Sequence, residues 1–358
     1  MLNIAIIGCG KISDIHASVL QRIDSARLIA VCDKEPLMAQ QMQERFRVEH
    51  YFSDVYELLN DTNPDVVHIT TPPESHIELG KICLEAGHHV YIEKPFTVDL
   101  AQTVDLIELA NNKGLKIIAG HNDQFTNAAR ELRQLVKKGY LGGKPVQMES
   151  YYCYDLGDEV YAKALLGDKK HWVRRLPGKL LHNIISHGIA RITEFIETDE
   201  PKVIAHGYTS EVLKNIGETE IIDELRVIVA DGEERSAYFT FSSQMSPSLH
   251  QFRIFGPKNG LLLDHDNQAL IKLPGKRFKS YLDKFIPNFA FSWEYLRSTG
   301  RNLKQFLKRD FHMDGGMQFL IKSFYDSILG LSPLPISYRE IILTTKIMDD
   351  IFNQLNTK

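Results

Sequence analysis

The sequence predicts an α/β protein with a doubly wound parallel sheet first and an α+β region with a mostly antiparallel open sheet after it. Short apolar segments alternate with helical patterns from residue 2 to about 120, which is typical of parallel sheets with crossover helices. These segments are nearly uninterrupted Ile, Val, Leu and Ala, as expected where helices cover both faces. Beyond residue 139, strand-like segments instead follow one another and meet at turn signals such as Asp231-Gly232.

We expect the first domain to span residues 1–121 and the second to span residues 122–358. In the first, the expected strands are 2–7, 27–32, 66–70, 88–92 and 115–119, and the expected helices are 14–22, 36–46, 75–86 and 99–113. In the second, a helix over 126–139 is followed by strands over 144–154, 202–209, 223–230, 235–243, 249–255 and 260–264. Two more helices are expected there, over 184–196 and, at the C-terminus, over 337–355.

The composition is that of a folded protein with two hydrophobic cores. Its 358 residues, 43% of them hydrophobic, exceed what one core of typical size accommodates. A net charge of −4 gives no overall attraction to nucleic acid, so we expect no nucleic-acid partner. The four cysteines lie far apart, which argues against a metal site and disulfides and favours a reducing, cytoplasmic location.

A loop with two glycines follows the first strand. In IGCGKIS, Gly8 and Gly10 occupy the first two glycine positions of G-x-G-x-x-G and Ser13 the third, where we expect a helix to begin. Gly8 would permit a tight turn, Gly10 would let the backbone approach a pyrophosphate, and the helix would direct its first amides at that anion. We therefore expect a Rossmann-type dinucleotide site that includes Gly8, Gly10, Lys11 and Ile12. The alternative is that the glycines only shape the turn.

An acid ends the second strand, 20 residues after Ser13. Asp33 would accept hydrogen bonds from an adenosine ribose 2′-hydroxyl and repel a 2′-phosphate, which favours NAD over NADP. The neighbouring Lys34 is a cation, which would instead attract the 2′-phosphate of NADP. A strand-end cap is the alternative role for Asp33.

The strand over 88–92 ends in Glu93, Lys94 and Pro95. Ligands of such sheets lie beyond the carboxyl ends of the strands, so Lys94 is expected to face the cofactor cleft. There it could transfer a proton or stabilise a developing alkoxide, while Pro95 restricts its backbone. The alternative is an ordinary strand-end charge with Glu93 as its partner.

Several segments resemble, in their order and spacing, the glucose-fructose oxidoreductase / inositol dehydrogenase / rhizopine catabolism (Gfo/Idh/MocA) family of NAD(P)-dependent oxidoreductases. They are IGCGKISDIHASVL, VCDK, HITTPPESH, ICLEAGHHVYIEKPF and GHNDQF, and the resemblance resumes in PISYREIILTTKIMDDIF. It implies that Lys94 lies against nicotinamide and substrate and that Glu93 contacts the cofactor. It also implies that Thr71, Pro72 and His76 line the dinucleotide site.

The segment LPGKLLHNIISHGIA resembles the family's second catalytic element. Asn183 matches its acid or amide position and His187 its histidine, and a spacing of four places both on one helix face. The resemblance implies that His187 is a general acid/base and that Asn183 orients a hydroxyl; a core histidine is the alternative for His187. The sequence departs from the family pattern at three places. Only Gly178 remains of the family's glycine run, Ala190 replaces an aspartate and Gln124 replaces an arginine. These departures affect which substrate is expected more than which type of reaction.

Four more residues are expected to contact the substrate. Trp172 and Arg174 resemble residues that cover the nicotinamide side of the site, and Asn122 lies in the GHNDQF element. His182, beside Asn183, is either a polar substrate contact or a helix-entry residue.

The resemblance implies hydride transfer between nicotinamide and a CH–OH carbon of a sugar, a nucleotide sugar or a lipid-linked sugar, by a homodimer or homotetramer without a metal. Glycosidase-type chemistry through transient oxidation and a non-catalytic, cofactor-sensing binding protein are the alternatives. The presence of both Lys94 and His187 favours an enzyme, because a sensor needs no proton relay.

Residues 275–311 form a basic, aromatic segment outside the family core. From Lys276 to Arg309, nine Lys and Arg accompany two acids, Asp283 and Glu294, which gives a net charge of +7. Aromatic residues interleaved with cations are typical of an interfacial amphipathic helix and indicate peripheral membrane contact. The alternative is a pair of helices packed on a neighbouring subunit or over the active site, with the aromatics in a core.

Overall fold

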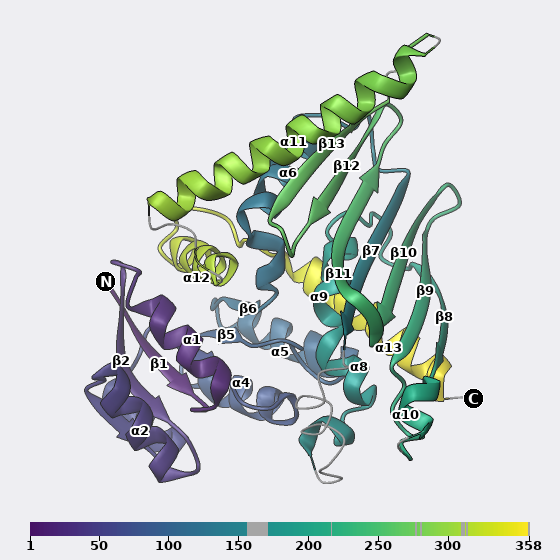
Figure 1. Cartoon of the computed structure of the whole chain (residues 1–358). Coiled ribbons are helices and arrows are strands. Elements are labelled where there is room, and N and C mark those ends of the chain that lie inside the picture. Colours follow the sequence, from purple (N-terminus) through teal and green to yellow (C-terminus); the bar gives the residue numbers. More distant parts are fainter. Residues whose placement is uncertain are drawn as a thin grey trace. The chain divides into compact units, whose positions relative to one another are not determined.

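The computed structural model describes residues 1–155, 171–215, 217–275, 278–279, 281–308, 312 and 314–356. By their contacts, they form two compact units (Figure 1). The first comprises Met1–Asn122 and Gly316–Lys346, and the second comprises Asp123–Gly315 and Ile347–Lys358. The first unit therefore takes in a C-terminal stretch as well as the region up to Asn122.

A six-stranded parallel sheet forms the centre of the first unit, in the order β3-β2-β1-β4-β5-β6. Its strands are β1 (Leu2–Ile7), β2 (Ala26–Cys32), β3 (His50–Phe52), β4 (Val66–Ile69), β5 (His89–Ile92) and β6 (Ile117–Ala119). The predicted doubly wound sheet is confirmed. The chain reverses its direction of travel across the sheet between β1 and β4, where proteins of this class bind nucleotides at the carboxyl ends of the strands.

Helices alternate with these strands: α1 (Lys11–Leu20), α2 (Pro36–Phe46), α3 (Val55–Thr62), α4 (His76–Glu85) and α5 (Leu100–Asn112). The side chains of Asp54 and Asp99 cap α3 and α5 by accepting hydrogen bonds from first-turn amides. The expected start of α1 near Ser13 is wrong. The helix begins at Lys11, because Gly10 is its N-cap, and Ser13 lies buried in its first turn.

The C-terminal stretch of the first unit contains most of α12 (Gly315–Ile328) and the start of α13 (Tyr338–Asn356). Buried Met317, Leu320, Ile321 and Phe324 recur along α12 at the spacing of one helix face. Within the unit, Thr103 in α5 donates a hydrogen bond to Thr345 in α13 at 3.1 Å. This stretch is therefore part of the first unit's core.

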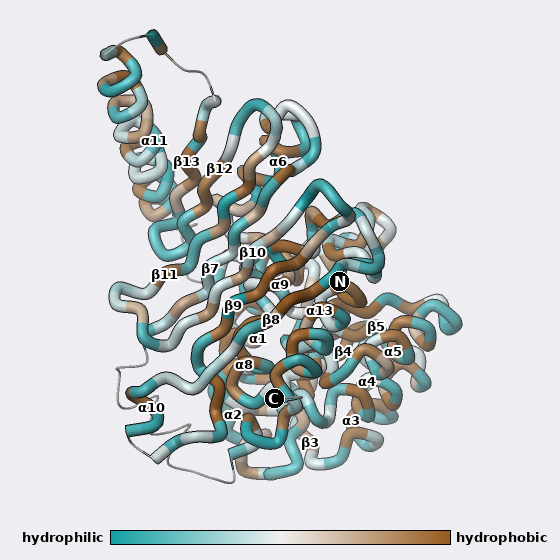
Figure 2. Tube along the Cα trace, turned by 90° about the vertical axis from the view of Figure 1, so that its right-hand side faces the viewer, coloured by the Kyte–Doolittle hydropathy of each residue, from teal (hydrophilic) through white to brown (hydrophobic). Residues whose placement is uncertain are grey.

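The second unit contains a seven-stranded sheet in the order β13-β12-β11-β7-β10-β9-β8. Its strands are β7 (Gln147–Asp155), β8 (Lys202–Tyr208), β9 (Glu224–Asp231), β10 (Arg235–Ser242), β11 (Gln244–Phe255), β12 (Asn259–Asp264) and β13 (Ala269–Pro274). Only β7 and β10 pair in parallel, so the expected mostly antiparallel sheet is confirmed. Apolar residues recur along its strands (Figure 2).

The helices of this unit are α6 (Asn127–Lys137), α8 (Lys179–Ile184), α9 (Ser186–Thr193), α10 (Glu211–Asn215) and α11 (Leu282–Leu307). The helix expected over 184–196 corresponds to α9, which is shorter, and α8 precedes it as a short helix that the sequence analysis did not include. α11 lies along the edge of the sheet beside β13 (Figure 1).

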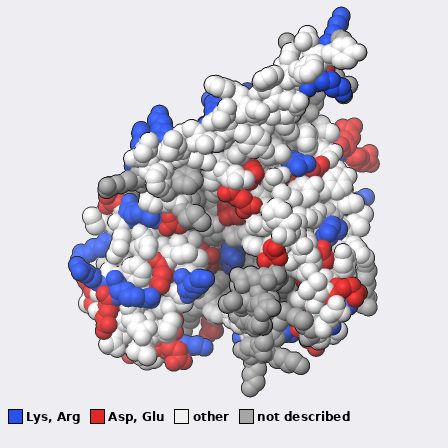
Figure 3. Space-filling view, viewed as in Figure 1, with Lys and Arg blue, Asp and Glu red and all other residues white. Residues whose placement is uncertain are grey.

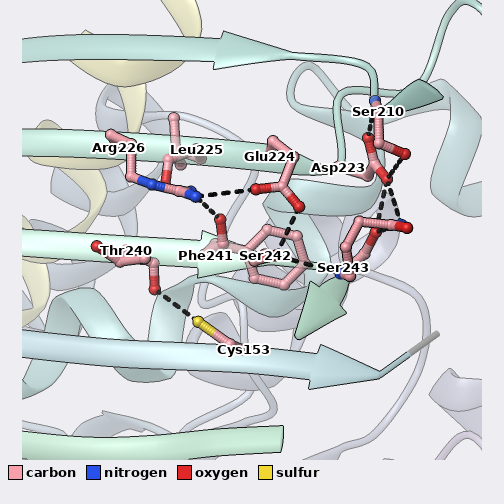
Figure 4. A network of polar contacts seen from close by, with 11 residues as sticks. Cys153, Ser210, Asp223, Glu224, Leu225, Arg226, Thr240, Phe241, Ser242 and Ser243 are labelled. Atoms are coloured by element: carbon pink, nitrogen blue, oxygen red, sulfur yellow. Dashed lines mark hydrogen bonds and ion pairs between the residues drawn. The ribbon is translucent and has the colours of Figure 1, made fainter. Parts of the chain in front are cut away.

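Two buried carboxylates begin β9 (Figure 4). Asp223 accepts hydrogen bonds from the Ser210 amide at 2.6 Å and from the Ser243 hydroxyl at 2.5 Å, and Glu224 accepts one from the Ser242 hydroxyl at 2.6 Å. Because these acids are satisfied by their neighbours, we interpret the network as a structural tie between strands. Within the described ranges, no helix is long and apolar enough to cross a membrane.

Candidate functional site

The loop after β1 depends on a glycine at position 8. Gly8 has a φ of +97°, and a Cβ there would lie 2.7 Å from Thr71 Cγ2 and 2.9 Å from the Thr71 amide nitrogen. Gly10 differs, since nothing among the described residues lies within 4 Å of where its Cβ would be. The loop is therefore tightly packed at Gly8 and open at Gly10, which leaves room for a ligand to approach the backbone.

The first turn of α1 follows this open position. No side chain caps the helix at Gly10, and the first amides of a helix have no intrahelical acceptor. Lys11 is exposed and Ile12 half-buried in that turn. The loop and helix start thus have the features of an anion site.

Asp33 follows β2 beside this loop. Its Oδ2 accepts a hydrogen bond from the Cys9 amide at 2.7 Å, and its Oδ1 accepts one from the Glu35 amide at 2.9 Å. The carboxylate is therefore fixed at the strand end with lone pairs remaining. Burial, with Asp33 nearby, raises the pKa of the Cys9 thiol to about 12, so this thiol stays neutral.

The segment after β4 carries the three residues expected to line the dinucleotide site. Thr71 is half-buried and Pro72 is exposed. His76 is fully buried, with its Nε2 2.8 Å from the Thr71 carbonyl oxygen and its Nδ1 3.0 Å from that of Pro95. The His76 ring thus joins the loops after β4 and β5, and through Thr71 it supports Gly8.

A chain of buried polar side chains leads inward from Glu93. Glu93 Oε1 lies 2.9 Å from His16 Nε2, His16 Nδ1 lies 2.8 Å from His68 Nδ1, and His68 Nε2 lies 2.7 Å from the Tyr325 hydroxyl. We call these four residues the buried relay. Its members come from four elements or their ends, namely α1, β4, the end of β5 and α12.

One arrangement of protons satisfies the whole relay. Tyr325 donates to His68, His68 donates through Nδ1 to His16, and His16 donates through Nε2 to an ionised Glu93. Burial lowers the pKa of His68 well below its usual value, so His68 is neutral as this arrangement requires. Burial raises the pKa of Glu93, but the hydrogen bond from His16 and the charge of Lys94 outweigh it, and the net shift is downward.

Lys94 follows the relay directly. Its amide donates to Glu93 Oε2 at 3.1 Å, its side chain is half-buried, and the Lys94–Pro95 peptide is cis. A Cβ on Gly120 would lie 2.9 Å from Glu93 Oε1, so a glycine is needed for the carboxylate to occupy its position. Glu93 faces the interior of the unit, and its expected contact with a cofactor stays a prediction.

In the second unit, His187 lies beside a fixed acid. Its Nδ1 is 4.0 Å from Asp123 Oδ2, and the same oxygen accepts a hydrogen bond from Arg191 Nη2 at 2.8 Å. Burial raises the pKa of Asp123, but the charges of His187 and Arg191 outweigh it and lower the pKa below its usual value. The ring of Tyr152, centred 5.9 Å from that of His187, packs against this group. The arrangement suits an imidazole whose protonated form must be stabilised.

The two departures from the family pattern contact one another. Gln124 Nε2 donates to the Ala190 carbonyl oxygen at 2.9 Å. Gln124 therefore has a structural partner in α9 where the family often has an arginine.

Asn183 and His182 lie in α8, one turn before His187. Asn183 is half-buried, whereas His182 is 2% exposed and stacks on Phe352, with ring centroids 4.9 Å apart. A Cβ on Gly178 would lie 2.2 Å from the same Phe352 ring. The structure thus gives His182 a packing role that neither sequence interpretation included, and its substrate contact stays a prediction.

For the remaining predicted substrate contacts, the described residues show partners other than His187. Arg174 forms a nearly buried ion pair with Glu218 at 2.6 Å, and Trp172 is half-buried with its ring 5.6 Å from that of His171. Asn122 is the half-buried last residue of the first unit's N-terminal part. In the described part of the chain, no group of three or more His, Cys, Asp or Glu is placed to hold a metal.

Comparison with known proteins identifies the first unit. Residues 2–121 match the family model Gfo/Idh/MocA, described as an oxidoreductase family with an NAD-binding Rossmann fold. Over these residues, the chain matches the NAD-binding Rossmann domain of the Gfo/Idh/MocA family.

Two curated relatives of this chain are similar over part of their length. Myo-inositol 2-dehydrogenase of Thermotoga maritima is 33% identical over 141 residues, which are 39% of this chain and 42% of that protein. D-glucoside 3-dehydrogenase of Escherichia coli is 32% identical over 142 residues, which are 39% of this chain and 40% of that protein. The chain thus matches less than half the length of these relatives.

A solved structure extends the likeness in fold. The WlbA dehydrogenase from Bordetella pertussis, in complex with NADH and UDP-GlcNAcA, matches with a TM-score of 0.77 over 99% of this chain and 96% of that one. Its sequence identity is 14%, so this likeness concerns the fold alone.

The sequence analysis missed five residues of the candidate sites: His16, His68, Tyr325, Asp123 and Arg191. His68 offered a signal, because a histidine inside an otherwise apolar strand needs a buried polar partner. Asp123 and Arg191 offered none, since 68 residues separate them.

Proposed function

We propose that the protein is an NAD-dependent oxidoreductase that transfers a hydride between nicotinamide and a CH–OH carbon of a sugar or sugar derivative. The observation that carries this proposal is the open position at Gly10, with fixed Asp33 beside it and Lys94 on the same edge of the parallel sheet. Free sugars, nucleotide sugars and lipid-linked sugars all contain the required carbinol. The proposed assembly is a homodimer or homotetramer in the cytoplasm.

The residues of the first unit suit NAD. A pyrophosphate fits beside Gly10, where a backbone cradle has no Cβ and the first amides of α1 have no intrahelical acceptor. The Asp33 carboxylate suits a ribose 2′-hydroxyl and repels a 2′-phosphate, so NADP should bind more weakly. NAD, when bound, supplies the hydride acceptor or donor; the protein supplies orientation and proton handling.

The names of related proteins support the choice of substrate class. Relatives act, by their names, on myo-inositol and on D-glucosides, and the WlbA structure contains UDP-GlcNAcA. These compounds share secondary hydroxyl groups on a ring. We propose that this chain acts on such a hydroxyl, in a free, nucleotide-linked or lipid-linked sugar.

We assign the proton chemistry to Lys94 and His187, acting on the same substrate oxygen. The Lys94 ammonium would stabilise negative charge on that oxygen, and the ionised Glu93 behind it would hold the backbone of Lys94 in place. His187 would take or return the hydroxyl proton, and Asp123 would stabilise its protonated form. Asn183 would orient the hydroxyl by hydrogen bonding.

The test is a nicotinamide-fluorescence screen of the purified protein against inositols, free sugars, nucleotide sugars and lipid-linked sugars. Once a substrate is found, Lys94→Ala should keep its affinity for NAD and lose a factor of about 10² to 10⁴ in turnover. Lys113→Ala, at an exposed helix end, is the control and should be unchanged. Unimpaired turnover of Lys94→Ala would refute the assignment, and NAD binding without turnover of any substrate would favour the binding-protein alternative.

A further inference from the structure

Helix α11 carries an apolar stripe along its whole length. Its members recur every three, four or seven residues, so they share one face of the helix. All are more than half exposed, including Phe289 at 76% and Trp293 at 67%. The stripe residues are Phe285, Phe289, Trp293, Leu296, Leu303 and Leu307. One alternative in the sequence analysis placed these aromatics in a core. Their exposure shows that they are not part of a core within this chain.

The opposite face of α11 attaches the helix to the second unit. Ser298 is buried there, Arg301 donates to the Gln268 carbonyl oxygen at 2.8 Å, and Asn302 donates to that of Asn267 at 3.0 Å. The helix is thus fixed by its polar face and presents its apolar face outward. This is the reverse of the usual orientation of an amphipathic helix on a globular protein.

A basic groove lies under the same helix. It has a volume of about 460 Å³ between α6, β13 and α11. Its charged lining residues are Arg130, Glu131, Lys138, Lys272, Arg297 and Arg301. Five cations therefore accompany one acid among the described lining residues, and Arg301 and Arg297 already share that acid, Glu131.

The net charge along α11 is positive, like that of the basic groove. Over the described residues from 278 to 308, Lys279, Lys284, Arg297, Arg301, Lys304 and Lys308 accompany Asp283 and Glu294. Lys and Arg side chains recur along the helix in the space-filling view (Figure 3). The basic positions Lys276, Arg277 and Arg309 lie outside the described residues.

We propose that α11 and the basic groove dock the protein on an anionic phospholipid surface. The apolar stripe would enter the interfacial region of the bilayer, where Trp and Phe are favoured, and the groove would receive a lipid phosphate. The flanking lysines reach anionic headgroups from the helix's sides. A second copy of this chain is the less favoured occupant, because pairing α11 with itself brings cations to cations.

The proposal is independent of the redox activity and is tested by sedimentation with vesicles. Wild-type protein should sediment with phosphatidylcholine vesicles containing 30% phosphatidylglycerol at 50 mM salt, and should lose this binding at 500 mM salt or on phosphatidylcholine alone. The stripe variant Phe289→Ser/Trp293→Ser should bind at least tenfold more weakly. The groove variant Lys138→Ala/Lys272→Ala should bind about 25-fold more weakly, at about fivefold for each cation.

A control variant, Tyr56→Ser/Lys113→Ala, removes an exposed aromatic and a cation from the first unit and should bind as wild type. Circular dichroism melting should show that all variants are folded. Absence of sedimentation at 50 mM salt would overturn the proposal. Equal binding by the stripe variant and the wild type would also overturn it. If the stripe variant binds vesicles as the wild type does but has a lower molar mass by light scattering, the stripe is a subunit interface.

Discussion

His16 Nε2 lies 2.9 Å from Glu93 Oε1, with both side chains buried. This contact joins the helix that begins at the glycine loop to the residue that precedes Lys94. His16 also accepts a hydrogen bond from His68, which in turn accepts one from Tyr325. The positions of the loop after β5 and of α12 therefore depend on one imidazole.

Replacing His16 by Leu should destabilise the first unit by about 3 kcal/mol, because it leaves two buried atoms, Glu93 Oε1 and His68 Nδ1, without the hydrogen-bond partner that His16 provides. Urea unfolding followed by circular dichroism measures this change. Ser18→Ala, in the same helix, removes only a hydrogen bond to the Asp14 carbonyl and should change the free energy of unfolding by less than about 0.5 kcal/mol. A loss no larger than that of the control would show that the relay contributes nothing.

The stability of the protein should fall as the pH drops below about 6.5. His68 resists protonation in the folded state because burial lowers its pKa, whereas the unfolded chain takes up the proton at its usual value. The contribution of His68 is thus complete above pH 6.5 and is lost as the pH falls, at up to about 1.4 kcal/mol per pH unit. Urea unfolding at pH 7.5 and 5.5 should show a smaller loss for His68→Asn than for the wild type, and equal losses would contradict this account.

Gly8 and Gly10 should respond differently to the same substitution. Gly8→Ala forces a side chain into a left-handed backbone and against Thr71, and should cost about 3 kcal/mol of stability. Gly10→Ala meets no described atom and has extended backbone angles, so its stability should stay within about 0.5 kcal/mol of the wild type. Its affinity for NAD should nevertheless fall at least tenfold by titration calorimetry. Unchanged affinity would remove the pyrophosphate from this position.

Asp123→Asn should lower turnover at least tenfold with the affinity for NAD unchanged, since it removes the carboxylate beside His187. Initial rates at saturating NAD measure the effect. Glu149→Gln, which alters a half-buried carboxylate of the same unit near Arg253, serves as the matched control. If both variants lose the same activity, Asp123 has no special part in catalysis.

Much of the fold could be predicted from local patterns, whereas the polar contacts could not. Strands such as Leu2–Ile7 are continuous apolar runs, and helix alternation then determines the sheet class. β3 was missed because its three residues are too few for a periodic signal. α12 was missed although its buried residues recur at helical spacing, so that pattern was readable. The helix expected over 184–196 is present as α9, whereas α8 before it was missed because its six residues are too few for a periodic signal.

Some residues of the candidate sites could likewise be predicted from local patterns, and others could not. Gly8, Gly10 and Asp33 are recognisable because backbone chemistry restricts their residue types to a short segment. Tertiary folding alone brings His16 next to His68 and Asp123 next to Arg191, so the spacing of these residues in the sequence does not predict the contacts. His182 stacks on the ring of Phe352, a contact between distant parts of the sequence that its position beside the motif does not reveal.

The stretch Gly316–Lys346 belongs to the first unit and supplies Tyr325 to the inner end of the relay. During synthesis, the N-terminal strands therefore leave the ribosome long before the helix that completes their core. At translation rates of about 5 to 20 residues per second, this delay is on the order of ten seconds or more. Over that period the nascent chain exposes the apolar surface that α12 later covers, which makes it a natural client for chaperones.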